Sequence, residues 1–408
     1  MEGLTALHAL DVRSINPRLV KRPLERINAG NPLLALSELG FTPTQIKELI
    51  VGTLTPFFEN PSILNEVDVG LLAIEGTNVG KITTDPEGEQ FLQLILGVYR
   101  AAYRADADAT FDVIASWDET IQISVREFWN QCLFEINKED LDLEHFRFEA
   151  FRNIGGVAEA CIQPYLREGL ALTRIAAGGS PDLGSMAFGQ VVRDYSRALG
   201  DTSFLAPQPW GLFLSDWRNI AQHHSSRVDG ESIVATYGRP DSPQTITLTR
   251  SELLDVLRRV FFRLSIVKSA RNIFTFDHFE EAKRTISDLE PGEPSILFQL
   301  SSALATQGFQ VVDSGVTDND VTIILRDMQP GCNHGRMAHC TQFPITVWLH
   351  YRKPLVRIRY LDSDGILHLT IETDGADMER ITANGEIDWE GLADCLRLTP
   401  EISEDRIG

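Results

Sequence analysis

Residues 214–224, LSDWRNIAQHH, combine side chains that can carry out phosphoryl transfer. Their apolar spacing predicts a short helix, with Asn219 and His223 on one face because they are four residues apart. Arg218 adjoins them, and the Ser-Asp pair near the start is expected to cap the helix, whose free N–H groups favour a nearby phosphate. Histidine transfers a proton near neutral pH, and arginine holds an anionic oxygen with two hydrogen bonds. These residues therefore indicate acid–base chemistry on a phosphate ester.

The spacing between arginine and histidine is not specific by itself. Arg271-Asn272 followed by His278 has a similar spacing, but it lies in a predicted long helix whose apolar stripe favours a structural or solvated role. The 214–224 segment differs because two histidines stand in tandem and a polar hairpin follows. The simpler alternative is a helix end with a solvated arginine and two surface histidines.

With R-N-I-A-Q-H in an all-helical region, followed by a hairpin and a long helix, the chain resembles the HEPN superfamily. These are helical-bundle proteins, many of them metal-independent ribonucleases. Their motif is an arginine, a polar residue and a histidine after a total gap of four to six residues. Arg218, Asn219 and His223 match it, and His224 matches at the next offset. The resemblance covers roughly residues 90–288 as a fold.

The resemblance implies an endoribonuclease without metal or cofactor, working as a homodimer that brings two motifs face to face. RNA would be cleaved by its own 2′-hydroxyl, leaving a 2′,3′-cyclic phosphate. His223, with His224 beside it, would act as general base or acid, Arg218 would stabilise the phosphorane, and Asn219 would orient the histidine or the phosphate. Ser225 stands where HEPN toxins controlled by nucleotidyltransferases carry a tyrosine, which argues against control by adenylylation.

The same resemblance implies a toxin or antiviral-defence effector, with RNA as substrate and a regulatory protein partner. The alternative is a non-catalytic HEPN-like subunit that binds nucleotide or RNA, or serves as a scaffold in a larger assembly.

The candidate RNA-binding residues are Arg227, Arg259 and Arg263. Residues 250–271 carry six bases and two acids, a net charge of +4, and could line an RNA path. An exposed helix face with snorkelling arginines explains them equally well.

A second group of possible ligands consists of Cys332, His334, His339 and Cys340. Two cysteines and two histidines can complete a tetrahedral zinc site. However, their Cys-x-His and His-Cys spacings crowd ligands that structural sites usually separate by two or more residues. A loop with unpaired residues is therefore the favoured interpretation, and the sequence predicts no metal and no cofactor.

The apolar spacing along the rest of the chain predicts a mainly α protein. We expect an N-terminal helical region over 1–84, a HEPN-like helical bundle over 85–289 that carries a β-hairpin at 232–249, and an α+β domain with an antiparallel sheet over 290–408. In that last domain a helix is followed by strands, among them ITVWLHY, LVRIRYL and ILHLTIET, which read as an antiparallel meander.

Helix starts are marked by specific capping residues. Asn31-Pro32 and Thr42-Pro43 each place a capping residue before a proline, which is favoured at the first helical position. A long helix is expected over 250–288, with Thr249 or Ser251 as its cap.

Composition restricts the class of partner. The chain has 408 residues and a formal net charge of −21, which excludes nucleic-acid binding by a diffuse excess of positive charge. The charge is uneven, since residues 361–408 hold 13 acids and three bases. Five cysteines without a repeated spacing, and the lack of a signal-peptide pattern or a long apolar run, predict a cytoplasmic protein that does not contact a membrane.

Overall fold

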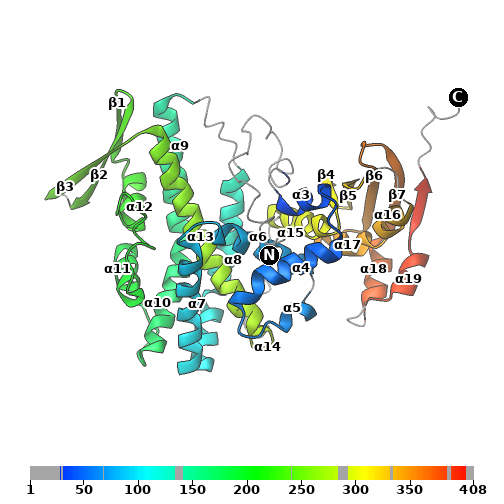
Figure 1. The fold of residues 1–408 in the computed structure, drawn as a ribbon, viewed down its shortest axis with the longest axis horizontal. Coiled ribbons are helices and arrows are strands. Elements are labelled where there is room, and N and C mark those ends of the chain that lie inside the picture. Colours follow the sequence, from blue (N-terminus) through cyan, green and yellow to red (C-terminus); the bar gives the residue numbers. More distant parts are fainter. Residues whose placement is uncertain are drawn as a thin grey trace. The chain divides into compact units, whose positions relative to one another are not determined.

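The structure is a computed structural model that describes residues 28, 31–67, 69–133, 141–239, 241–283, 293–330, 334–383 and 387–400 (Figure 1). It divides the chain into two compact units. Unit 1 comprises residues 1–52, 67–77 and 293–408, and unit 2 comprises 53–66 and 78–292. The chain thus passes between the units after residues 52, 66, 77 and 292, where the sequence predicted boundaries after 84 and 289. That assignment depends on packing between distant segments, which local periodicity does not report.

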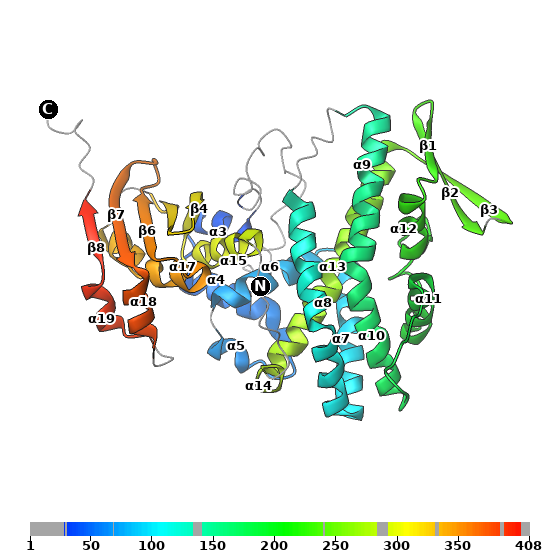
Figure 2. The ribbon, with the colours of Figure 1, turned by 180° about the vertical axis from the view of Figure 1, so that it is seen from behind.

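Unit 2 is a helical bundle. Figures 1 and 2 show its long helices running side by side, with the shorter α11 and α12 along one flank. Its principal helices are α7 (Gly88–Ala105), α8 (Ala107–Leu133), α9 (Leu143–Gly156), α10 (Gln163–Ala176), α11 (Phe188–Leu199), α12 (Leu214–Gln222) and α13 (Arg250–Asp277). A π-helix, η4 (Val157–Ile162), joins α9 directly to α10. Among its described residues, unit 2 also has three short helices: η3 (Thr55–Phe57), α5 (Ile63–Glu66) and α14 (Phe279–Ala282).

Helix α13 lies at the centre of this bundle, with α7, α9 and η4 packed against it. Thr249 caps it, since its hydroxyl accepts the Glu252 N–H while the Glu252 carboxylate accepts the Thr249 N–H at 2.7 Å. Of the two expected caps, Thr249 and not Ser251 is therefore the N-cap residue. The helix ends at Asp277, earlier than the expected 288, and residues 284–292 lie outside the described part of the chain.

A three-stranded antiparallel sheet follows α12. Strands β2 (Ser232–Arg239) and β3 (Ser242–Leu248) form the predicted hairpin, with Ile233 opposite Leu248. A short strand, β1 (Ser226–Asp229), pairs with the other edge of β2 and was not expected. A segment of four residues is too short to show the alternating apolar pattern of a strand. The strand conformation of β1 therefore follows from its pairing with β2, which the sequence pattern does not reveal.

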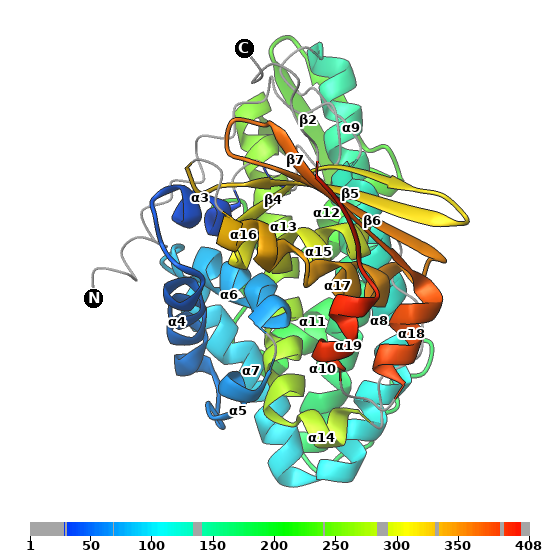
Figure 3. The same cartoon turned by 90° about the vertical axis from the view of Figure 1, so that its right-hand side faces the viewer.

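Unit 1 contains a five-stranded mixed sheet in the order β4, β5, β6, β7, β8. Its strands are β4 (Phe309–Val316), β5 (Asp320–Asp327), β6 (Leu355–Leu361), β7 (Leu367–Asp374) and β8 (Arg397–Pro400). Its helices are α3 (Pro32–Glu38), α4 (Pro43–Leu54), α6 (Val69–Thr83), α15 (Glu293–Thr306), α16 (His334–Cys340), α17 (Phe343–Tyr351), α18 (Gly375–Thr382) and α19 (Trp389–Asp394), of which α4 and α6 continue into unit 2. Figure 3 shows α15 and α17 on one face of the sheet.

The expected antiparallel meander is wrong in two respects. The segment ITVWLHY belongs to helix α17, and β5 pairs with β6 in parallel. Parallel neighbours need a crossover connection, which α16 and α17 supply. Pro344 at the start favours a helix, but a short apolar run has no periodicity that separates a buried helix from a strand. Packing against β6 and α15 decides the matter.

Within the described part of the chain, no helix has the length and apolar character that crossing a membrane requires.

Candidate functional site

Helix α12 carries the predicted motif and is anchored by its apolar face. Leu214, Trp217 and Ile220 are buried at intervals of three residues, so the opposite polar residues face outward. The helix begins after Phe213, whose N–H is accepted by the Asp216 carboxylate at 3.2 Å. The expected cap, Ser215 or Asp216, is therefore wrong in position: Phe213 is the N-cap residue, and Asp216 lies one turn inside the helix, where partial burial raises its pKa.

Arg218 is held in place by Glu159. Its Nε donates to Oε2 of that carboxylate at 3.0 Å and its Nη2 donates to Oε1 at 2.5 Å. Its Nη1 also donates to the Asn219 side-chain oxygen at 3.1 Å. These three bonds use three of the five N–H donors of the guanidinium. The other two donors have no partner among the residues that the structure describes, so they can bind an anionic oxygen while the side chain stays oriented.

Glu159 is a site residue that sequence reasoning missed. It lies on η4, 59 positions before Arg218, and no spacing rule connects the two. π-helical turns are rare and occur frequently at functional sites. The buried residues Ala158, Cys161 and Ile162 hold this turn in the bundle, so the carboxylate projects from a rigid element.

The two histidines occupy different surroundings. His223 is the exposed C-cap residue of α12, and its N–H donates to the Asn219 carbonyl at 3.0 Å. His224 has a left-handed backbone with φ of 49°, a conformation that costs a non-glycine residue roughly 1 kcal/mol. The next N–H, from Ser225, donates to the Ile220 carbonyl at 3.0 Å and completes a helix-ending turn.

His224 is turned back toward α9 by this conformation. Its ring lies nearly parallel to that of Phe148, with an interplanar angle of 11° and ring centroids 6.3 Å apart. Phe148 is 46% exposed, although most large apolar side chains of the unit are buried. His224 and Phe148 thus form an aromatic pair at the surface.

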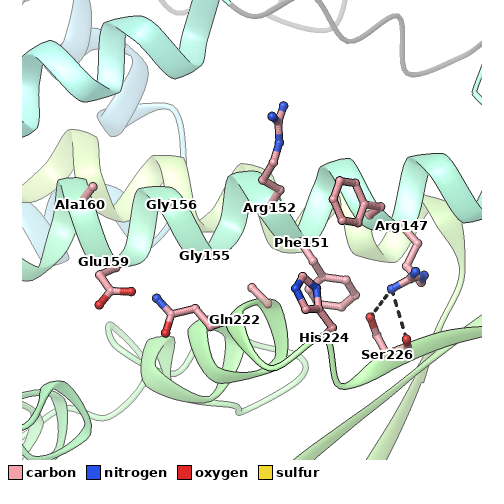
Figure 4. Close-up of a pocket in the computed structure, with 12 residues that line it drawn as sticks. Arg147, Phe151, Arg152, Gly155, Gly156, Glu159, Ala160, Gln222, His224 and Ser226 are labelled. Atoms are coloured by element: carbon pink, nitrogen blue, oxygen red, sulfur yellow. Dashed lines mark hydrogen bonds between the residues drawn. The ribbon is translucent and has the colours of Figure 1, made fainter.

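A groove of about 550 Å³ runs between α9 and α12, and we call it the α9–α12 groove (Figure 4). Figure 4 shows Glu159 and Gln222 toward one end, Arg147 and Ser226 toward the other, and His224 between them. Its lining residues are Arg147, Phe148, Phe151, Arg152, Gly155, Gly156, Glu159, Ala160, Ala221, Gln222, His224 and Ser226. Glu159 connects the groove to Arg218, so the motif and the groove adjoin.

The floor of the α9–α12 groove depends on a close helix approach. A Cβ placed on Gly155 would lie 2.7 Å from the Cβ of Ala221, closer than real atoms approach. Glycine is therefore required for α12 to lie this near to α9. At the far end, Arg147 donates to the Ser226 hydroxyl at 2.8 Å and to its carbonyl at 3.2 Å, which ties β1 to α9.

The three predicted RNA-binding arginines do not form one surface. Arg227 is exposed on β1. Arg259 is partly exposed and forms an ion pair with Asp85 at 3.0 Å. Arg263 is only 1% exposed and its Nε donates to the Phe204 carbonyl at 3.1 Å, so its predicted RNA contact is corrected to a role in the core. Burial lowers the pKa of Arg263 to about 10.

The second arginine–histidine match is part of the core, in agreement with a structural role. Arg271 pairs with Asp118 at 2.8 Å and with Glu168 at 3.2 Å, and all three are buried. His278 follows the end of α13, and its ring lies against Tyr103 with centroids 4.1 Å apart. This match therefore offers no open site.

The candidate zinc ligands are separated by their surroundings. Cys340 is fully buried in the core of unit 1, and burial raises its pKa. His339 stacks on Phe309 with ring centroids 6.0 Å apart, while His334 is exposed, and Cys332 lies outside the described residues. Among the residues the structure describes, no group of three or more His, Cys, Asp or Glu side chains could hold a metal ion.

Comparison of the chain with protein-family models, curated proteins and solved structures finds no match. The chemistry of the site is therefore inferred from its geometry. An oriented arginine, an adjacent amide and an exposed histidine beside a groove can bind a phosphate and move a proton.

Proposed function

We propose that the chain is a metal-independent endoribonuclease of HEPN type, acting at the site formed by Arg218, Asn219 and His223. The observation that carries this proposal is the double hydrogen bond between Arg218 and Glu159, which orients a guanidinium with two donors that no described residue accepts. A pre-oriented cation needs no reorganisation when negative charge develops in a transition state. The groove beside it has a size typical of small-ligand sites.

In the proposed reaction the 2′-oxygen of a ribose attacks the adjacent phosphorus. The 2′-oxygen–phosphorus bond forms, the bond from phosphorus to the 5′-oxygen breaks, and a 2′,3′-cyclic phosphate remains. Arg218 stabilises the charge on the non-bridging oxygens. His223 takes the proton from the 2′-hydroxyl or gives one to the 5′-oxygen. A second copy of the chain in a homodimer supplies the histidine for the other transfer.

The test is cleavage of structured RNA by the purified full chain in the presence of EDTA. We expect products with 2′,3′-cyclic phosphate ends and loss of cleavage in Arg218→Ala. The matched control is Arg197→Ala, because Arg197 is 77% exposed on α11 and forms an ion pair with its own helix neighbour Asp194. Equal activity of Arg218→Ala and the wild-type chain would exclude this site.

Binding without cleavage would favour the alternative function, a non-catalytic RNA-binding subunit. In that case the wild-type chain retains RNA, Arg218→Ala weakens retention, and the RNA is recovered intact. Expression of the wild-type chain and of Arg218→Ala in bacteria then tests the toxin proposal, since only an active ribonuclease should slow growth.

A further inference from the structure

We propose that the α9–α12 groove binds one unpaired nucleobase of the RNA, stacked on the aromatic pair formed by Phe148 and His224. The inference rests on the proposed function for its ligand class and deepens it, since it makes single-stranded or looped RNA the substrate. It assigns different roles to the two adjacent histidines. His223 moves a proton, and His224 holds a base.

The aromatic pair is suited to a flat ligand. Two rings with an interplanar angle of 11° present surfaces that a planar base can stack on without disturbing either side chain. Phe148 is 46% exposed on α9, so its ring is accessible to a ligand in the groove. Stacking on aromatic side chains is the common way in which proteins hold single-stranded nucleic acid, and every base has a face that can stack.

The backbone at His224 supports the same conclusion. Glycine usually occupies the left-handed position that ends a helix, because it has no side chain to strain. Here a histidine occupies it, with φ of 49°, and the strain is retained at a residue whose ring lines the groove. Strained conformations of this kind are concentrated at binding and catalytic sites.

The polar groups of the groove fit a nucleotide better than an apolar protein segment. Gln222 and Glu159 lie toward one end, and Glu159 leads to Arg218, which keeps two donors for a phosphate (Figure 4). Arg147 fixes Ser226 toward the other end through two hydrogen bonds. A base in the middle with its phosphate at Arg218 matches this order, whereas a docked protein helix would need an apolar lining throughout.

The binding experiment uses a fluorescein-labelled 2′-O-methyl dodecanucleotide, which has no 2′-hydroxyl and cannot be cleaved by the proposed route. Anisotropy is measured with the full chain, using the oligonucleotide alone and annealed into a perfect duplex. We expect the single strand to bind more tightly. Phe148→Ala and His224→Ala should each weaken its binding roughly tenfold or more, the scale of one lost stacking contact.

Two control variants distinguish the loss of a stacking contact from a loss of folding. Phe148→Tyr keeps the ring and should bind within about twofold of the wild-type chain. Trp389→Ala removes an aromatic side chain that is 54% exposed on α19 and should leave binding unchanged. Circular dichroism and thermal unfolding of each variant confirm that the bundle is intact.

Cleavage of unmodified RNA, measured in parallel, distinguishes the two proposals. Binding that depends on Phe148 without any cleavage supports the base subsite and overturns the ribonuclease. Cleavage by the wild-type chain that Phe148→Ala leaves unchanged, with unchanged binding, overturns the subsite alone. Equal affinity for single strand and duplex, or no binding of the single strand, also overturns the subsite.

Discussion

Arg218 and Glu159 form a two-bond ion pair that joins helix α12 to the π-helix η4, with donor–acceptor distances of 3.0 and 2.5 Å. Both side chains remain partly exposed, at 23% and 37%. Pairs of this exposure typically contribute about 1 kcal/mol or less to stability. The geometry of this pair therefore matters more for orienting the guanidinium than for holding the fold.

Glu159→Gln should lower RNA cleavage by about tenfold or more while changing the free energy of unfolding by about 1 kcal/mol or less. The neutral amide cannot accept two charge-assisted hydrogen bonds from the same guanidinium, so Arg218 loses its fixed orientation. Single-turnover cleavage and urea unfolding measure the two effects. Asp255→Asn, which removes a surface partner of Arg258 on α13, is the control. If Glu159→Gln lowered the free energy of unfolding enough to explain its loss of cleavage, the result would contradict an orienting role for Glu159.

His223→Ala should reduce cleavage by roughly 10²–10⁴-fold, the contribution typical of a general acid or base. Affinity for the uncleavable single strand should be unchanged, since His223 does not line the groove. Cleavage rate and anisotropy are compared in the same preparation. His334→Ala, an exposed histidine in unit 1, is the matched control. Full activity of His223→Ala would exclude it as the residue that moves the proton.

Gly155→Ala should destabilise unit 2 by roughly 1–3 kcal/mol, because its new methyl group would lie 2.7 Å from Ala221 and push α12 away from α9. Thermal unfolding should show a melting temperature lower by a few degrees. Gly97→Ala is the matched control, because Gly97 is exposed in the middle of α7 and a Cβ added there would meet no atom within 4 Å. It should stabilise the helix by roughly 1 kcal/mol. If both substitutions lowered the melting temperature, or both raised it, the result would contradict the close approach of α12 to α9 at Gly155.

Glu168→Gln should reduce the dependence of stability on pH. Burial raises the pKa of Glu168 above its ordinary value of 4.5, although Arg271 and the Tyr99 hydroxyl both favour the carboxylate. Above that ordinary value the folded state holds a proton that the unfolded chain has lost. The stability contributed by this group is therefore complete below pH 4.5 and is lost as the pH rises through the raised pKa.

Urea unfolding between pH 4.5 and 8 measures this effect. The stability of Glu168→Gln relative to the wild-type chain should increase as the pH rises. Glu89→Gln, an exposed position on α7, provides the reference for a solvated carboxylate. A difference between Glu168→Gln and the wild-type chain that does not vary with pH would show that Glu168 is charged throughout.

Thr249→Ala should cost about 1 kcal/mol, because it removes the hydroxyl that accepts the Glu252 N–H at the start of α13. Ser251→Ala, two positions later and exposed, should have almost no effect. Thermal unfolding of both variants distinguishes them. Equal melting temperatures would mean that the reciprocal cap contributes nothing to the stability of α13.

Features that depend on near neighbours in the chain could be predicted from the sequence. Asn31 caps α3 by accepting the Leu33 N–H, Thr42 caps α4 by accepting the Gln45 N–H, and the hairpin at 232–249 is present, because each depends on residues within a few positions. Arg218 and Asn219 are likewise neighbours in the chain, and the Asn219 side-chain oxygen accepts from Arg218, while His223 directly follows α12 and donates its N–H to the Asn219 carbonyl.

Features that depend on partners distant in the chain are set by tertiary packing. It placed Glu159 beside Arg218, buried Arg263 in the core, and made ITVWLHY a helix between a strand and another helix. Sequence spacing describes one element at a time, and α13 was expected to have an exposed basic face because its other neighbours were unknown. Burial and pairing are set by every segment that packs against a residue, so they emerge only when the chain is folded.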